Sequence, residues 1–285
     1  MTSIIIPVYK MLHYTRRAVE AIRANTSGDY EIVLSEDGSE EHGEYAKRAR
    51  LSYVTGEHGG FAVACNRGAE VARGDVLVFL NNDTVVQKGW LEALLAPLGN
   101  GYHVTAPLLL YPGGILQHCG MVVGWALGQI KPRLLYEGYP WSFPPAHKRR
   151  EFSVLTGACL AIQRDVWEDV GGFDEAYING LEDVDMCLRL RQKGYRLLYC
   201  PEAKVIHYCG MSPGRFDHEK KNYELFLSRW QGKVRLDEWK YYIEDLPHSL
   251  RWIVKVAVGS FCPQFVRRLY WQAKRYSIRR MKRLW

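Results

Sequence analysis

The sequence predicts an α/β fold with a mainly parallel central sheet flanked by helices, followed by a helical extension at the C-terminus. Three observations lead to this prediction. The chain has 285 residues, 47% of them hydrophobic, which suits one large domain with an appendage or two modest domains. Apolar runs typical of strands alternate with helical patterns over the first part of the chain. The clearest run, 76–80, has no polar alternation, as in a strand buried on both faces, and stops at three polar residues, 81–83.

The first strands and helices follow from the hydrophobic pattern. A buried strand is expected at 3–8, and Pro7 should end it because proline cannot donate to a ladder. Further strands are expected at 31–35, 51–54 and 76–80, with helices at 14–24 and 61–72 and another between the second and third strands. This order favours right-handed crossovers and a parallel sheet. No G-x-G-x-x-G follows the first strand and no G-x-x-x-x-G-K-[ST] occurs, which disfavours a dinucleotide-dependent dehydrogenase and a P-loop enzyme.

Beyond residue 89 the pattern is less regular. The prolines and aromatic residues of 131–150 are typical of a long surface loop. The remaining expected elements are helices at 90–98, 164–170 and 182–193, a buried strand at 152–162 interrupted at Gly157, and short strands at 195–200 and 203–207. The acidic first turn and basic last turn of the 182–193 helix suit the helix dipole and need no function to explain them.

The positive charge is concentrated at the C-terminus. The net charge is +7, yet residues 246–285 contain ten Lys and Arg and no Asp or Glu, so the first 245 residues carry −3. This division argues against a nucleic-acid groove on the main domain and for an anionic surface that the C-terminus contacts. The seven cysteines form no C-x-x-C pair, which favours reduced, buried thiols. The opening strand leaves no room for a secretory leader, and no apolar run reaches eighteen residues without a charge, so we expect a cytoplasmic protein without a membrane span.

The polar residues after the 76–80 strand are the first candidates for chemistry. Ligands of open α/β sheets bind beyond the carboxyl ends of the strands, where a carboxylate can hold a divalent cation against phosphate oxygens. Asn82 and Asp83 are therefore expected to face a crevice. The alternative is an ordinary turn rich in Asn and Asp. The 31–35 strand also ends in acidic residues, Glu36 and Asp37, which favours a site.

Seven short stretches stand out in order along the chain. They are Ser-Ile-Ile-Ile-Pro-Val-Tyr (3–9), Glu-Asp-Gly-Ser (36–39), Gly-Gly-Phe-Ala-Val-Ala-Cys-Asn-Arg-Gly (59–68), Leu-Asn-Asn-Asp-Thr (80–84), Thr-Gly-Ala-Cys (156–159), Gly-Gly-Phe-Asp-Glu (171–175) and Glu-Asp-Val-Asp-Met-Cys-Leu-Arg (182–189). Each alone is a weak signal, but the series in this order is specific. Over roughly residues 3–230 the chain resembles the family 2 inverting glycosyltransferases, whose GT-A fold is Rossmann-like.

The resemblance implies a binding site for a nucleotide-sugar donor. The family's matching positions hold the base and ribose or lie near the nucleotide, and in this sequence they are Pro7, Tyr9, Asp37, Gly60, Asn66 and Asn82. Glu36 stands where the family usually has its first Asp, which preserves the charge and leaves its contact open. Asn82 replaces a frequent Asp, so the site has one charge fewer.

The resemblance also implies a metal ion and a base. Asp83 matches the last acid of the family's metal motif, and His207 falls where related members supply an imidazole to the same ion, Mn²⁺ or Mg²⁺. Asp183 matches the catalytic base. A cation neutralises charge on the leaving diphosphate, and the N-terminus of a helix keeps a carboxylate ionised and able to act as a base. A single displacement then inverts the anomeric carbon without a covalent sugar intermediate.

Simpler interpretations of these residues remain open. Asp183 also fits an ordinary acid in the first turn of a helix, and Glu182 is its main rival as the catalytic base. His207 also fits a hydrogen-bonded core histidine at the end of a strand.

Two domains are predicted: a catalytic domain over 1–230 and a basic, amphipathic helical extension over 231–285. On a helical wheel, most apolar residues of the tail fall on one side and most basic residues on the other, although Arg280 and Arg283 break the pattern. Such a helix suits the surface of an anionic membrane. The alternatives are that the tail packs back on the catalytic domain or binds a partner.

The sequence therefore predicts a metal-dependent inverting glycosyltransferase at the cytosolic face of a membrane. It would move a sugar from a UDP or dTDP sugar to a hydroxyl of a glycan or lipid-linked acceptor, and the pattern leans towards rhamnosyltransferases that build bacterial surface glycans. One alternative is a sugar nucleotidyltransferase, which would need a Gly-rich basic loop where this chain has Pro7-Val-Tyr-Lys-Met. The other is an inactive glycan-binding homologue, against which the retained base and metal residues argue.

Overall fold

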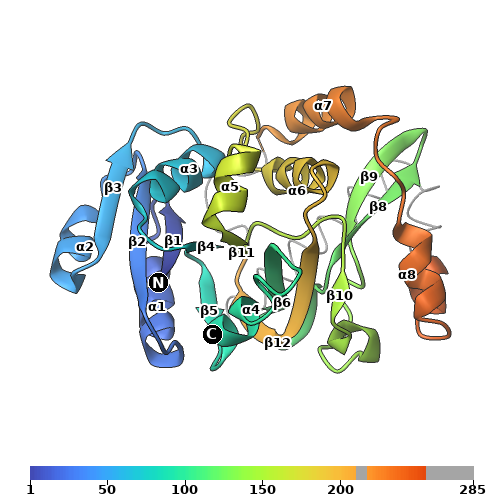
Figure 1. Cartoon of the computed structure of the whole chain (residues 1–285), viewed down its shortest axis with the longest axis horizontal. Coiled ribbons are helices and arrows are strands. Elements are labelled where there is room, and N and C mark those ends of the chain that lie inside the picture. The colour runs from blue at the N-terminus through green and yellow to red at the C-terminus, as the bar shows by residue number, and fades with distance from the viewer. Residues whose placement is uncertain (210–216, 255–285) are drawn as a thin grey trace.

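The computed structural model describes residues 1–209 and 217–254. Its centre is a ten-stranded sheet in the order β10-β12-β6-β11-β4-β1-β2-β3, with β5 and β7 pairing beside β12 and β6. β1, β2, β3, β4, β6 and β12 all point the same way, because β11 is antiparallel to both β4 and β6. The prediction of a mainly parallel sheet is confirmed, and β11 joins its two parallel halves (Figure 1).

The N-terminal half alternates strands and helices as expected. Its elements are β1 (Thr2–Val8), α1 (Leu12–Asn25), β2 (Tyr30–Asp37), α2 (Gly43–Ala49), β3 (Ser52–Gly56), α3 (Phe61–Val71) and β4 (Val76–Leu80). The expectation that Pro7 ends its strand is wrong, because β1 continues to Val8 beside β2. Pro7 lies beyond Ile5, the last residue of β1 paired with β4, so a residue without an amide hydrogen is tolerated there.

The C-terminal half departs more from the expected elements. It contains β5 (Thr84–Val86), α4 (Trp90–Leu95), β6 (Val104–Tyr111), β7 (Ile115–His118), β8 (Met121–Ala126), β9 (Gln129–Leu134), the 3₁₀ helix η1 (Pro144–His147), β10 (Arg150–Glu151), β11 (Cys159–Gln163), α5 (Arg164–Val170), α6 (Glu182–Gln192), β12 (Leu197–His207), α7 (Glu219–Trp230) and α8 (Glu238–Glu244). The strand expected over 152–162 is only β11, and the two expected after 194 are one strand, whose register shifts between Cys200 and Lys204.

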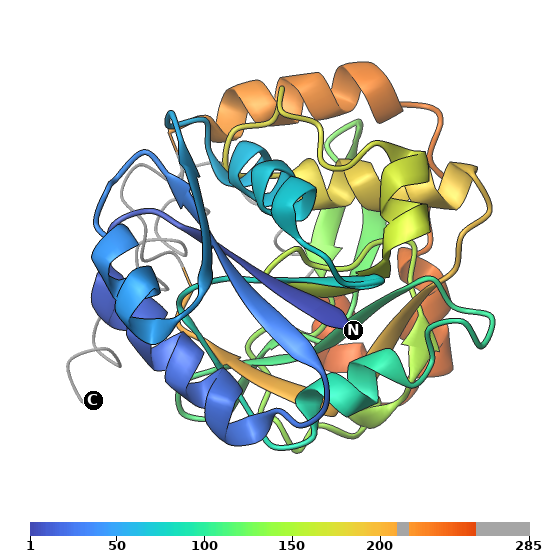
Figure 2. The same cartoon turned by 60° about the vertical axis from the view of Figure 1, so that its left-hand side comes forward.

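Helices cover both faces of the sheet, as Figure 2 shows. Alternate residues of the central strands enter two separate apolar clusters. Ile5, Leu77 and Phe79 belong to the cluster that includes residues of α3, α5, α6 and α7. Ile4, Ile6 and Val78 pack with α1, α2 and α4. The uninterrupted apolar runs therefore reflect strands buried on both sides.

The prediction of a surface loop over 131–150 is wrong. β9 and η1 lie within it, and Leu135 and Tyr136 are fully buried. The Tyr136 hydroxyl donates to Asp245 Oδ2 at 2.7 Å, and Arg150 Nη1 donates to the same atom at 2.9 Å. Trp252 adds edge-on ring contacts with Tyr136. Asp245 and Trp252, which follow α7 in the sequence, thus pack over this segment and bury its aromatic side chains.

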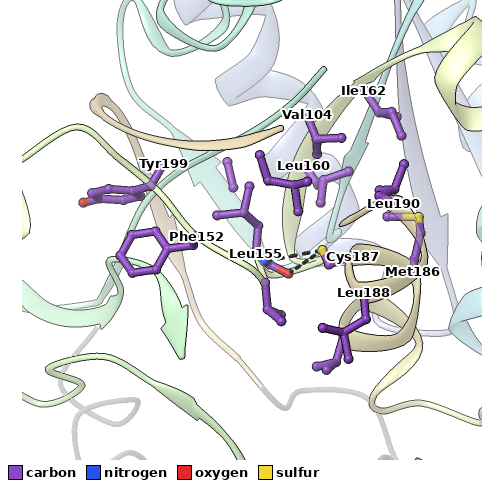
Figure 3. Close-up of a cluster of buried hydrophobic side chains, with 14 of the residues drawn as sticks. Val104, Phe152, Leu155, Leu160, Ile162, Met186, Cys187, Leu188, Leu190 and Tyr199 are labelled. Carbon is purple, nitrogen blue, oxygen red and sulfur yellow. Dashed lines mark hydrogen bonds between the residues drawn. The ribbon is translucent and has the colours of Figure 1, made fainter. Parts of the chain in front are cut away.

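The apolar cluster around α6 fixes the helix against the sheet (Figure 3). Met186 and Leu190 of α6 share one apolar cluster with residues of β11 and β6, whereas Leu188 points to the opposite side of α6. Cys187 Sγ accepts from the Leu155 N–H at 3.4 Å and donates to its carbonyl at 3.5 Å. Within the described part of the chain the cysteines are free, as predicted, and no helix there is long and apolar enough to cross a bilayer. The wheel residues of the predicted tail, beyond 254, and Cys262 lie outside the described residues.

Candidate active site at the carboxyl edge of the sheet

Four strands end at the same edge of the sheet. β1, β2, β4 and β12 run in parallel, so their carboxyl ends bring Tyr9, Asp37, Asp83 and His207 to this edge. β5 returns antiparallel to β12 and places Thr84 opposite His207, which brings the β4 turn next to the end of β12. The strands therefore gather residues that are more than a hundred positions apart in the sequence.

Asp83 and His207, which the resemblance assigns to one ion, form a close pair, and their role as metal ligands stays a prediction. His207 Nε2 lies 3.0 Å from Asp83 Oδ1, and both side chains are buried. His207 Nδ1 lies 2.7 Å from Gln117 Oε1, which can only accept, so the ring donates from Nδ1, and a neutral ring has its lone pair on Nε2. Two acceptors at this distance repel each other unless a cation or a proton lies between them.

The donor set near this pair fits a divalent cation. Asn81 Nδ2 lies 3.3 Å from His207 Nε2, and Asn81 Oδ1 is buried with no hydrogen-bond partner among the described residues. A carboxylate, an imidazole lone pair held by Gln117 and an amide oxygen without a partner are ligand types for Mn²⁺ or Mg²⁺. Within residues 1–209 and 217–254, no three or more His, Cys, Asp or Glu gather at one point.

Asp37, Gly60 and Tyr9 form a second group. Asp37 is 4% exposed and accepts backbone N–H bonds from Gly59 at 2.7 Å and Gly60 at 3.0 Å. His58 Nδ1 lies 2.8 Å from Asp37 Oδ2, and the His58 ring stacks on Tyr9 with centroids 4.5 Å apart. Gly60 has φ +92°, a conformation that side chains rarely adopt. A planar platform thus stands over the end of β1, and His58, which has no assignment in the sequence interpretation, is part of it.

Pro7 and Asn66 occupy different surroundings. Pro7 is half-buried opposite Ser35, two residues before Tyr9 at the same strand end. Asn66 Nδ2 donates to the Phe173 carbonyl at 2.9 Å and to Glu175 Oε1 at 2.9 Å, while its Oδ1 accepts from the Phe173 N–H at 3.0 Å. The Asn66 amide is therefore engaged with the loop after α5, and nucleotide contact by Asn66 stays a prediction.

Glu36 turns away from the crevice. It is fully buried, and its oxygens lie 2.7 Å from His42 Nδ1 and 2.8 Å from the Tyr53 hydroxyl, with Ser39 as a third donor. Burial raises the pKa of Glu36, but hydrogen bonds from His42, Ser39 and Tyr53 outweigh burial and lower it to about 2. The residue in the place of the family's first Asp thus belongs to the interior.

Asn82 points its amide nitrogen into the protein. Asn82 Nδ2 donates to Thr15 Oγ1 on α1 at 3.1 Å, and Thr15 Oγ1 lies 3.0 Å from His42 Nε2. Neither Thr15 nor His42 stands out in the sequence, because a threonine within a helix and a histidine before one have no distinguishing pattern.

Asp183 and Glu182 begin α6 with different exposure. Glu182 is 7% exposed and accepts the Gly180 N–H, whereas Asp183 is half-buried. Asp183 Oδ2 accepts the Gly157 N–H and Oδ1 accepts the Val184 N–H, both at 2.8 Å. Two backbone donors thus fix the direction of the carboxylate. Asp183 is therefore the more accessible of the two carboxylates.

Gly157 and Ala158 connect Asp183 with Asn81, the residue that follows β4. Gly157 contacts Asp183, and its neighbour Ala158 accepts the Asn81 N–H through its carbonyl at 3.0 Å. A Cβ on Gly157 would lie 3.1 Å from the Asp183 Cβ, so glycine allows the close approach. The interruption expected at Gly157 thus has a physical reason, which is contact with another segment.

The profile described as Glycosyl transferase family 2 matches residues 3–171, and that of Glycosyl transferase family group 2 matches residues 146–262. The protein y4gI of Sinorhizobium fredii is 31% identical over 234 residues, which cover 78% of this chain and 26% of y4gI. The O-antigen biosynthesis protein RfbC of Myxococcus xanthus is 31% identical over 217 residues, which are 72% of this chain and 17% of RfbC. The chain thus spans about a quarter or less of these two relatives.

A relative of more similar size is the N-acetylglucosaminyl-diphospho-decaprenol L-rhamnosyltransferase of Mycobacterium tuberculosis. It is 28% identical over 255 residues, covering 77% of this chain and 81% of the relative. A crystal structure of GalNAc-T7 with UDP, GalNAc and Mn²⁺ has a TM-score of 0.60 at 22% identity, covering 73% of this chain and 43% of that one. S. aureus TarS 1–349 has a TM-score of 0.54 at 15% identity, with 85% and 78% covered. These structures show the GT-A fold, and the match to residues 3–171 means that the chain belongs to glycosyl transferase family 2.

Proposed function

We propose that the protein transfers a sugar from a nucleoside diphosphate sugar, of the UDP or dTDP type, to a hydroxyl of a glycan or lipid-linked acceptor with inversion. The observation that carries this proposal is that one sheet edge holds both the Asp83–His207 pair and the Asp183 carboxylate. The names of the relatives agree: one is a rhamnosyltransferase with a lipid diphosphate acceptor, and another belongs to O-antigen biosynthesis.

In this mechanism Asp183 is the general base. Its carboxylate is half-buried and held by two backbone N–H groups, so it is fixed in direction and can accept the proton of the acceptor hydroxyl as that oxygen attacks the anomeric carbon. The bond from that carbon to the diphosphate breaks in the same displacement, which inverts the configuration. Gly157 contacts Asp183 and its neighbour Ala158 contacts Asn81, so the carboxylate stays close to the end of β4.

Asp83 and His207 would hold Mn²⁺ or Mg²⁺, with Asn81 as a further oxygen donor. The ion would supply charge neutralisation for the leaving diphosphate. The platform of Tyr9 and His58 is suited to stack on a planar base, and Pro7 would line its edge.

We also propose that the protein works at an anionic membrane surface. Support comes from exposed apolar residues spaced three or four positions apart: Trp239, Ile243, Leu246, Leu250 and Val254. The last three of them belong to residues 246–285, which carry ten basic and no acidic side chains. A lipid-linked acceptor would be concentrated at the same surface.

A panel of nucleotide sugars with Mn²⁺ or Mg²⁺ tests the proposal. We expect slow release of one nucleoside diphosphate, faster when an acceptor is added, and a product of inverted configuration by NMR. Formation of a nucleotide sugar from a nucleoside triphosphate and a sugar phosphate would instead make the protein a nucleotidyltransferase. Glycan binding without any nucleotide binding would make it an inactive homologue.

A further inference from the structure

A chain of hydrogen bonds runs from Asn82 into the interior. Asn82 Nδ2 donates to Thr15 Oγ1 at 3.1 Å, which lies 3.0 Å from His42 Nε2. His42 Nδ1 in turn lies 2.7 Å from Glu36 Oε1. Thr15, His42 and Glu36 have no exposed surface. The chain thus links a half-buried residue of the crevice to a carboxylate that solvent does not reach.

The direction of each hydrogen bond follows from the Glu36 end. The ionised carboxylate of Glu36 can only accept, so His42 Nδ1 carries a hydrogen and donates it. In a neutral imidazole the lone pair is then on Nε2, which accepts the hydroxyl hydrogen of Thr15. The Thr15 oxygen is left to accept, and Asn82 must offer its nitrogen. The hydrogen bond between Glu36 and His42 therefore fixes the orientation of the Asn82 amide.

We propose that Thr15, His42 and Glu36 are positioning residues that hold the Asn82 amide with its oxygen towards the crevice, where it accepts a hydrogen bond from a hydroxyl of the nucleoside diphosphate. This inference rests on the proposed function. Asn82 is half-buried and turns its amide nitrogen to Thr15, so its Oδ1 points away from that hydroxyl.

The same chain accounts for an amide at position 82. A carboxylate there would present only acceptors, and in an Asn82→Asp variant the single hydroxyl hydrogen of Thr15 would have to serve both the new carboxylate and His42 Nε2. One buried acceptor would be left without a donor, which is costly. Asn82 supplies its own hydrogen and satisfies the whole chain.

The first test compares Thr15→Val, which removes the hydroxyl and keeps the shape, with Thr15→Ser, which keeps the hydroxyl. The matched control is Thr105→Val, because Thr105 is also fully buried and donates its hydroxyl to the Leu94 carbonyl, away from the crevice. Calorimetric titration with UDP and dTDP in Mn²⁺ should show about 3- to 10-fold weaker binding for Thr15→Val, because one hydrogen bond contributes about this much to affinity. Thr15→Ser and Thr105→Val should bind as the wild type does.

A double-mutant cycle with Asn82→Ala separates positioning from general damage. If Thr15 acts through Asn82, adding Thr15→Val to Asn82→Ala should not weaken nucleotide binding further. An equal loss in both backgrounds, or no loss from Thr15→Val alone, would overturn the proposal.

NMR of the ¹⁵N-labelled protein tests the chain without nucleotide. His42 should carry its hydrogen on Nδ1, and an Asn82 side-chain N–H should exchange slowly with solvent and lose that protection in Thr15→Val. A His42 hydrogen on Nε2 alone would overturn the chain. A wild type that binds no nucleotide would defeat the proposed function instead, so the two failures are distinguishable.

Discussion

Gly157 donates its backbone N–H to Oδ2 of Asp183 at 2.8 Å, and the two segments approach so closely that a Cβ on Gly157 would meet the Asp183 side chain. In an Asp183→Asn variant the side chain has one acceptor oxygen instead of two. It could therefore accept the N–H of Gly157 or that of Val184, but not both. The chemistry and the orientation of Asp183 therefore depend on the same two backbone donors.

Asp183→Asn should lower turnover by about 10²- to 10⁴-fold, because it removes the group that accepts the hydroxyl proton. Binding of the nucleoside diphosphate should stay close to that of the wild type, since the role proposed for Asp183 is towards the acceptor. Glu182→Gln is the matched variant at the buried neighbour. Steady-state kinetics and calorimetry decide the assignment, and a mild Asp183→Asn beside a crippling Glu182→Gln would transfer the role to Glu182.

Asp83→Ala should abolish activity and weaken nucleotide binding, because the diphosphate then meets an uncompensated site. Activity should disappear in EDTA and return with Mn²⁺ or Mg²⁺. His207→Ala should raise the metal concentration needed for half-maximal activity, and Gln117→Ala should raise it by up to about 10- to 100-fold through loss of the Nδ1 contact. His147→Ala, at an exposed histidine, is the control. Full activity in chelator would remove the metal from the mechanism.

Deleting residues 260–285 should abolish binding to anionic vesicles while the domain stays folded, because the packed residues Asp245 and Trp252 remain. Salt should weaken binding of the full chain, since surface attraction is screened over about 10 Å at 0.1 M. A water-soluble acceptor should still be used, whereas a lipid-linked acceptor in vesicles should be used poorly. Equal sedimentation of both proteins with anionic vesicles would refute the membrane proposal.

His118 should make stability depend on pH. Burial lowers its pKa from 6.5 to about 4, although its Nδ1–H donates to the Pro107 carbonyl. The unfolded chain takes up this proton below about pH 6.5 and the folded protein only near pH 4, so stability falls as pH drops through that window. The loss between pH 7 and pH 5 is about 2 kcal/mol.

The comparison variant is His118→Asn, whose amide can donate to the same carbonyl but does not titrate. Urea unfolding at pH 7 and pH 5 should show a smaller loss for this variant than for the wild type. Equal losses in the two proteins would mean that His118 does not titrate in this range.

The N-terminal half was predictable because its signals are local. A strand buried on both faces is a continuous apolar run, and its polar end marks the crevice, so the positions of β4 and of Asp83 could be inferred from neighbouring residues alone. The pairing of Asp83 with His207 is long-range, and it came from resemblance to a family. Pro7 does not end β1 and Ser35 does not end β2, because pairing with the neighbouring strands carries both strands further.

The parts that were missed depend on distant contacts. Residues 131–150 have the composition of a loop, and contacts with distant residues such as Asp245 and Trp252 bury them. His42 and Gln117 carry no local signal either, since they matter through side chains on other strands or helices. Glu36 matched the family by charge, but its hydrogen bonds place it in the interior.

β11 has a consequence for the order in which the chain folds. β1, β2, β3 and β4 pair within the first 80 residues, whereas β4 meets β6 only through Cys159–Gln163, some 80 residues further on. Contacts that close a long stretch of chain form late because their entropy cost is paid before they stabilise anything. Pulse-labelling hydrogen exchange during refolding should therefore protect amides of β1 and β2 before those of β11. Simultaneous protection would indicate that the two halves of the sheet fold as one unit.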